Sequence, residues 1–189
     1  GSSSRISSIN PTQGLAGEEI TITGTFSEPV LSVWVGTAEC TVSVTTATSV
    51  KCQFAPTKAV ASGSYPIKIL SEFGYAVAEG DPATSVALFT YTPQISAVEP
   101  ANVYSGSMST ITITGSAFSS SESRNEVSIA GTSCNVVKAS ATSLVCSLTS
   151  AATTLGLNSV SVSVEGGSSA LLANAITFEK PPTVTSVQP

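Results

Sequence analysis

Short stretches of alternating apolar and polar residues run along the whole chain. Ile20 and Ile22 alternate with threonines, and the same period of two recurs at intervals toward the C-terminus. This period places every second side chain on one face of a β-strand, so the stretches predict strands with one buried face. In the first half the positions expected to face the core are Ile20 and Ile22; Val33 and Val35; Cys40, Val42 and Val44; Val50, Cys52 and Phe54; Ile67 and Ile69; and Val86, Leu88 and Phe89.

The second half repeats this series of strands. Its inward positions are Ile111 and Ile113; Val127 and Ile129; Leu144, Cys146 and Leu148; Val160, Val162 and Val164; and Ile176 and Phe178. Each half therefore predicts about seven short strands with turn residues between them. This count indicates an all-β fold made of two tandem immunoglobulin-like β-sandwiches.

A six-residue motif occurs three times and sets the predicted domain boundaries. Ile6–Pro11 recurs as Ile95–Pro100 and again as Val184–Pro189, with the three prolines 89 residues apart. Repetition at a fixed period is typical of tandem modules. We expect a tag or linker over residues 1–4, one domain over 5–93, a second over 94–182, and the start of a third module over 183–189.

Charged residues are scarce, which narrows the range of functions. They make up 10% of the chain, the net charge is −5 and the pI is about 4.6. The seven lysines and arginines are scattered, whereas binding to nucleic acid needs them clustered. The acidic balance also disfavours an anionic membrane surface. The chain contains no run of 18 apolar residues, so the sequence does not predict a membrane-spanning helix.

Each repeat holds one pair of cysteines at the same spacing. Cys40 and Cys52 are 12 residues apart, as are Cys134 and Cys146. All four have inward parity, so adjacent strands could join each pair in a disulfide inside its own module. The alternative is four reduced, buried cysteines. Zinc is disfavoured because the chain has no histidine and no Cys-x-x-Cys. Disulfides would imply an oxidising compartment.

The repeated motifs resemble the IPT/TIG domain family. The similarity rests on Ile-x-x-Ile-x-Pro at Ile6–Pro11, the Ile-Thr-Ile-Thr-Gly of Ile20–Gly24 and its copy at Ile111–Gly115, and the cysteine pairs, and it runs from Arg5 to Lys180. It implies sandwiches of the E-set type. It also implies the tandem extracellular arrays of plexins, the hepatocyte growth factor receptor and fibrocystin-like ciliary surface proteins. The second repeat departs from the first where Ser128 stands in place of Trp34.

The residue types that most catalytic and metal sites need are missing. Without histidine, Ser-His-Asp and Cys-His arrangements are impossible. Asp81 is the only aspartate, which disfavours calcium. Glu18 and Glu19 are neighbours whose side chains would leave a strand on opposite faces, so they do not form a pair for glycoside hydrolysis. The sequence predicts no enzyme activity, no metal and no cofactor.

Four residues are candidates for binding a partner. Phe73 and Tyr75 lie in the segment Glu72–Asp81, which is longer in the first repeat, and aromatic side chains on a loop are plausible binding anchors. Arg124 lies in Ser119–Glu126, which is longer in the second repeat. Trp34 has outward parity. The alternatives are that Phe73 and Tyr75 extend a strand or pack on the linker, that Arg124 lies on a solvated loop, and that Trp34 covers a sandwich edge or the junction between modules.

The predicted function is that of a non-catalytic adhesion or recognition pair at the cell surface. Further IPT modules of the same chain and a protein on the same or another cell, homophilic or heterophilic, are the expected partners. A carbohydrate-binding accessory region of a secreted or surface protein is the alternative, and a Rel-like DNA-binding segment is less favoured. A purely mechanical spacer also stays open. No N-glycosylation acceptor occurs, since Asn10 precedes Pro11, so a glycoprotein would carry O-linked sugar at sites such as Ser119–Ser123.

Overall fold

The chain folds into two compact units, one ending at Thr92 and the next beginning at Pro93. The computed structural model describes residues 4–27, 29–72, 74–75, 77–78, 87–148 and 154–188. Within these ranges every element is a strand except one short 3-10 turn, η1 (Glu122–Arg124), so the all-β prediction is confirmed. The exact domain boundaries set by the prolines remain a prediction.

The first unit has seven strands of four or more residues among those described, and three strands of two residues. They are β1 (Arg5–Asn10), β2 (Gln13–Gly14), β3 (Glu18–Thr25), β4 (Val30–Val35), β5 (Ala38–Thr45), β6 (Ser49–Phe54), β7 (Gly63–Ser71), β8 (Gly74–Tyr75), β9 (Val77–Ala78) and β10 (Leu88–Tyr91). Their order is β2-β10-β7-β4-β5-β6-β3-β1-β9, with β8 on β7. Strand β5 joins the two layers of the sandwich, because Ala38–Cys40 pairs with β4 and Thr41–Thr45 pairs with β6.

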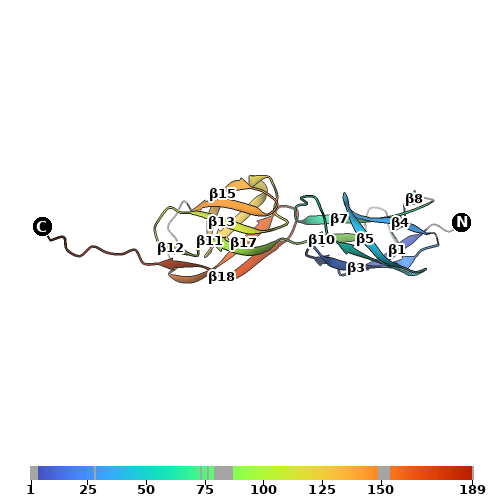
Figure 1. The fold of residues 1–189 in the computed structure, drawn as a ribbon, viewed down its shortest axis with the longest axis horizontal. Coiled ribbons are helices and arrows are strands. Elements are labelled where there is room, and N and C mark those ends of the chain that lie inside the picture. Colours follow the sequence, from blue (N-terminus) through green and yellow to red (C-terminus); the bar gives the residue numbers. More distant parts are fainter. Residues whose placement is uncertain are drawn as a thin grey trace. The chain divides into compact units, whose positions relative to one another are not determined.

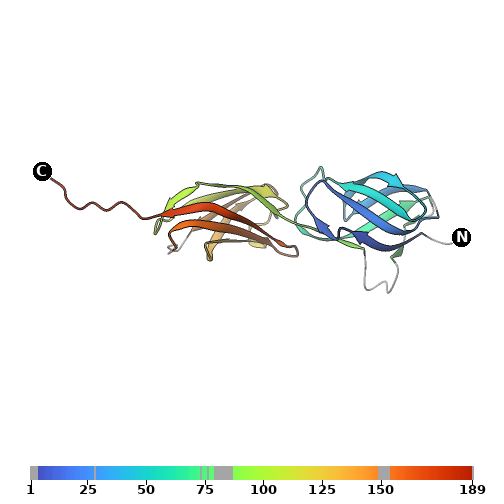
Figure 2. The same cartoon turned by 90° about the horizontal axis from the view of Figure 1, so that it is seen from below.

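The second unit repeats this arrangement. Its described strands are β11 (Gln94–Glu99), β12 (Asn102–Tyr104), β13 (Thr110–Ser116), β14 (Asn125–Ile129), β15 (Thr132–Ala139), β16 (Ser143–Leu148), β17 (Gly156–Val164) and β18 (Ser169–Glu179). Their order is β11-β13-β16-β15-β14-β17-β18-β12. Figures 1 and 2 show the strands of each unit folded into facing layers.

The core of the first unit lies where the two layers face each other. Phe54 on β6 meets Phe89 and Tyr91 on β10 edge to face, with ring centroids 5.4 and 5.0 Å apart. Aromatic pairs prefer this arrangement, and all three side chains are buried. Burial raises the pKa of Tyr91 above its ordinary value of 10.0, and the neighbouring Tyr65 raises it further. These rings connect the layers at the end of the unit where β10 leads into the second repeat.

Two positions predicted to face the core point outward instead. Val44 is 46% exposed because a β-bulge between Val42 and Val44 shifts the alternation along β5. Leu88 is 42% exposed because β10 turns Phe89 and Tyr91 inward, and a period of two then sends Leu88 to the outer face. The predicted inward residue Val86 lies outside the described residues.

One glycine in each unit allows the first strand to pair closely. A Cβ on Gly24 would collide with the backbone oxygen of Arg5, and a Cβ on Gly115 would collide with that of Gln94. Both contacts lie beside a register shift, between Ile6 and Ser8 in one unit and between Ile95 and Ala97 in the other. The repeated Ile-Thr-Ile-Thr-Gly therefore ends in glycine for a steric reason.

Candidate functional site

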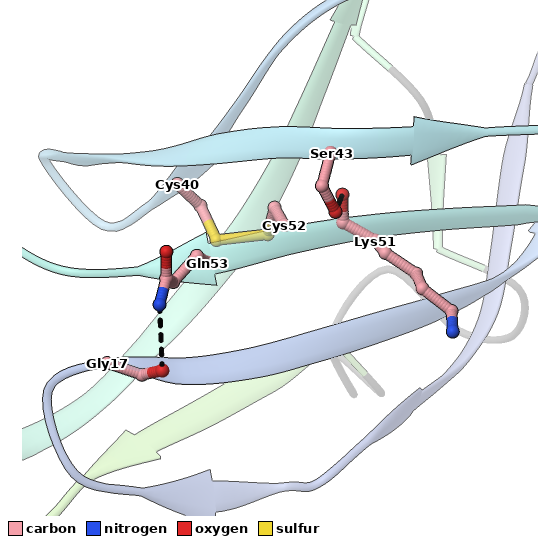
Figure 3. Close-up of a disulfide and its surroundings, with 6 residues drawn as sticks. All are labelled: Gly17, Cys40, Ser43, Lys51, Cys52 and Gln53. Carbon is pink, nitrogen blue, oxygen red and sulfur yellow. Dashed lines mark hydrogen bonds between the residues drawn. A yellow bond between two sulfur atoms is a disulfide. The ribbon is translucent and has the colours of Figure 1, made fainter.

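A buried disulfide links adjacent strands in each unit. Cys40 on β5 is bonded to Cys52 on β6, and Cys134 on β15 is bonded to Cys146 on β16. Figure 3 shows the first of these bridges between neighbouring strands, with Gln53 beside it donating a hydrogen bond to the Gly17 carbonyl. The structure thus pairs the cysteines as their spacing predicted. Each bridge lies where its first strand passes from one layer to the other: Cys40 pairs with Val33 of β4 and Cys134 with Val127 of β14, whereas Cys52 pairs with Ile20 of β3 and Cys146 with Ile111 of β13.

Trp34 lines a groove on the outer face of the first unit. The groove has a volume of about 420 Å³ and lies between the β4–β5 hairpin and the segment 55–60 that follows β6. The indole is partly buried, and its Nε1–H donates a hydrogen bond of 3.0 Å to Ser32 Oγ. Trp34 lies directly opposite Glu39 on one neighbouring strand and opposite Lys68 on the other. The outward parity predicted for Trp34 is therefore observed, although the groove could not be predicted from parity.

The polar groups around the groove come from both sides. Thr37, Glu39 and Thr41 line it from the hairpin, and Thr57 and Lys58 line it from the following segment. All five are exposed to solvent. Alanines, Pro56 and Val60 supply the apolar part of the lining. The site therefore combines one aromatic ring, hydroxyl groups and one charge of each sign.

Arg124 lies on η1 within an ordered loop of the second unit. Its Nε is 3.9 Å from Glu165 Oε2, but both side chains are largely exposed, so this ion pair contributes little. The loop is organised by Asn125, which is 6% exposed. Its Oδ1 accepts a hydrogen bond from the Ser119 amide, and its Nδ2 donates to the carbonyls of Ser119 and Ser121. Sequence reasoning missed Asn125, because nothing in the local pattern distinguishes it from an exposed loop residue.

The two predicted aromatic anchors are only partly placed by the structure. Phe73 lies outside the described residues. The backbone at Gly74–Tyr75 forms β8 and pairs with Leu70 and Ser71 of β7. This pairing agrees with the alternative in which the segment extends a strand. The side chain of Tyr75 is outside the described part of the chain, so its role as an anchor stays a prediction.

The outer face of β12, β18 and β17 carries exposed apolar side chains. Tyr104, Leu157 and Leu171 are 51%, 63% and 68% exposed. The register places Leu157 opposite Thr177, and Thr177 opposite Asn102, two residues before Tyr104. Leu171 lies opposite Ser161, four residues along β17 from Leu157. We call Tyr104, Leu157 and Leu171, which are spread along this outer face, the apolar surface of the second unit. Sequence reasoning did not select these residues.

Within the described residues no three His, Cys, Asp or Glu side chains gather where they could hold a metal ion. Over the same ranges no helix has the length and hydrophobicity to cross a membrane.

The fold of each unit is that of an immunoglobulin-like β-sandwich. The family model of the IPT/TIG domain matches the chain twice, over residues 4–85 and 93–180, so the chain belongs to this family. The resemblance seen in the sequence is thereby confirmed. A comparison with curated protein sequences finds no match.

Solved structures of similar fold come from several classes of protein. The extracellular region of plexin A4 is 20% identical over 98% of this chain, with a TM-score of 0.42, and the chain spans 16% of its length. A surface glycan-binding protein from Prevotella bryantii is 12% identical over 89% of this chain and 41% of its own length, with a TM-score of 0.50. A γ-CGTase from an alkalophilic Bacillus clarkii is 14% identical, covers 90% of this chain and 24% of its own, and has a TM-score of 0.38. At these identities the likeness shows the fold alone.

Proposed function

We propose that the chain is a non-catalytic recognition and spacer pair from an extracellular, multi-module surface protein. Family membership supports the module type, and two buried disulfides support an oxidising compartment. The third copy of the opening motif at Val184–Pro189 supports further modules in the same protein. Val184 and Val187 are more than 80% exposed here, whereas the equivalent Ile95 and Val98 are buried in the second unit.

The recognition role is carried by the apolar surface of the second unit. Exposed hydrophobic residues grouped on one sheet face mark protein contact sites more often than isolated ones do. Tyr104 adds a large aromatic side chain, a residue type enriched where binding energy concentrates. We propose that a protein partner covers this face, with apolar contact from Leu157 on β17 and from Leu171 on β18, which lies opposite Ser161 of β17.

Sedimentation velocity over a wide concentration range tests for self-association. The informative variant is Leu157→Ser/Leu171→Ser, and Val137→Ser is its control, since Val137 is 50% exposed on the same unit but lies on β15. Dimers in the wild type and in the control, lost in the double variant, would establish homophilic contact through this surface.

A monomer at all concentrations directs the test to other proteins. The pair is then displayed as a tetramer and its binding to cells is measured by flow cytometry with the same variants. Cell binding that the double variant loses and the control keeps would establish a heterophilic partner. If the double variant binds as the wild type does, Phe73→Ser/Tyr75→Ser tests the other candidate surface. If no binding is found at all, the recognition role is wrong and the spacer role alone stands.

A further inference from the structure

The groove beside Trp34 has the properties of a site for a small, uncharged, hydroxyl-rich ligand. We propose that it binds a neutral saccharide, with one pyranose ring lying against the indole. The site lies in the first unit, so this inference is independent of the apolar surface on the second. Its volume of about 420 Å³ falls in the range of small-molecule pockets, roughly 300–1,000 Å³.

The indole of Trp34 is suited to stacking. Its only polar atom is already satisfied by the hydrogen bond from Nε1 to Ser32 Oγ, which also fixes the ring along β4. The remaining ring surface that lines the groove is apolar and rigid. A pyranose presents C–H groups on its faces and hydroxyls around its edge, so a flat apolar ring can cover a face without burying the hydroxyls.

The rim of the groove matches the edge of such a ring. Sugar hydroxyls both donate and accept hydrogen bonds, and so do the hydroxyls of Thr37, Thr41 and Thr57. Glu39 adds an acceptor and Lys58 adds a donor. Because these two charges have opposite sign, the groove has no net charge that would select an acidic or a basic ligand. A neutral saccharide is the ligand class that uses all of these groups.

A proline-rich peptide fits the groove less well. Such peptides are bound in grooves lined by aromatic residues, and Trp34 is the only aromatic one among the described residues that line this groove. Hydroxyl and charged side chains make up much of the remainder, and a polyproline helix offers them only its carbonyl oxygens.

The second repeat lacks the residues that define the site. Ser128 stands where the first repeat has Trp34, Ser133 stands where it has Glu39, and the segment after Leu148 contains no lysine corresponding to Lys58. We therefore infer one saccharide site per pair of modules. The variant Trp34→Ser places in the first unit the residue that the second unit already carries at the equivalent strand position.

The chain contains a single tryptophan, so its fluorescence reports on this site alone. The wild-type chain is titrated with maltohexaose, cellohexaose, N-acetylchitohexaose and a galactan oligosaccharide, after an array of neutral and acidic glycans has been screened. We expect a saturable change in emission with at least one neutral glycan. Isothermal titration with that glycan should show about one site per chain, and affinity weakened at least about tenfold in Trp34→Ser and measurably in Glu39→Ser.

Two controls separate binding from damage to the fold. Circular dichroism must show Trp34→Ser folded, and Thr110→Ser, a conservative change on β13 of the second unit, should bind as the wild type does. The proposal is overturned if no neutral glycan changes the emission at millimolar concentration, or if Trp34→Ser binds the array glycan with unchanged affinity. It is also overturned if only acidic glycans or a proline-rich peptide produce the change.

Discussion

Removing one disulfide should destabilise only the unit that contains it. In the variant Cys40→Ala/Cys52→Ala the first unit loses a bridge that closes a loop with a sequence separation of 12. In the chain-entropy model a loop of this size is worth roughly 3 kcal/mol of unfolding free energy. The lost packing of two fully buried sulfurs acts in the same direction, because both cysteines lie in the core. For a module of this size we expect the free energy of unfolding to fall by at least about 3 kcal/mol.

The assay is urea unfolding followed by two signals. Tryptophan fluorescence reports on the first unit, which holds the only tryptophan, and circular dichroism reports on both units. A urea m-value of about 1–3 kcal/mol/M converts the loss into a fluorescence midpoint lowered by roughly 1–3 M. The matched control is Cys134→Ala/Cys146→Ala, whose bridge has the same separation of 12 in the second unit. It should lower a dichroism transition and leave the fluorescence midpoint in place.

Two results would refute this reasoning. A fluorescence midpoint that moves by less than about 0.3 M in the first variant would mean that the bridge adds little to stability. A fluorescence midpoint that moves equally in both variants would mean that the two units do not unfold independently, contrary to two separate cores.

Three further perturbations follow from contacts within single units. Asn125→Ala leaves the buried Ser119 amide and the carbonyls of Ser119 and Ser121 without their partner, and should lower unfolding free energy by about 1–3 kcal/mol in urea unfolding followed by circular dichroism. Gly24→Ala forces a Cβ against a backbone oxygen and should cost about 1–3 kcal/mol, with faster amide exchange in β1. Burial raises the pKa of Tyr65 and of Tyr91 above 10.0, so stability should be full below pH 10 and be lost as pH rises through their folded-state pKa values, as thermal unfolding at increasing pH will show.

Each of these perturbations has an outcome that would contradict it. Asn158→Ala removes a partly exposed asparagine of the same unit whose solvent-exposed amide bonds also reach backbone carbonyls, and should be nearly neutral. If the two asparagine variants lowered the free energy of unfolding equally, the buried hydrogen bonds of Asn125 would not be what stabilises the loop. Unchanged amide exchange in Gly24→Ala would show that β1 has room to move. A constant melting temperature above pH 10 would show that the two tyrosines titrate alike in folded and unfolded chain.

The sequence predicted the strands well because most of them bury one face, and a period of two is then visible in the residues. The prediction was wrong at Val44, because a bulge on β5 shifts the alternation there. It was also wrong at Leu88, because the neighbouring Phe89 and Tyr91 of β10 face the core. A bulge leaves no trace in the local order of apolar and polar residues. Parity alone therefore cannot predict where such an alternation shifts.

The surfaces were harder to predict than the core for a physical reason. Trp34 was selected because it alternates outward, but its groove depends on residues 55–60, which fold back to it only in three dimensions. The apolar surface of the second unit depends on the register of three strands, one of them parallel. Asn125 gained its role from the burial of its own side chain beside Ser119, which no local pattern reveals. The pairing of the four cysteines was easier to predict, because both repeats carry two inward-facing cysteines at the same spacing.

Each disulfide also limits how far its unit can lengthen when the chain is pulled. A stretched residue spans at most about 3.3–3.6 Å, so the 12-residue loop closed by each bridge withholds about 40 Å of extension from its unit until the sulfur bond is reduced. An oxidised pair under tension would therefore open to a shorter final length than a reduced one, with the difference divided equally between the two units. Reducing the bridge of an unfolded unit would then add about the same length from either unit. The maximum extension of the chain would therefore depend on the redox conditions around it.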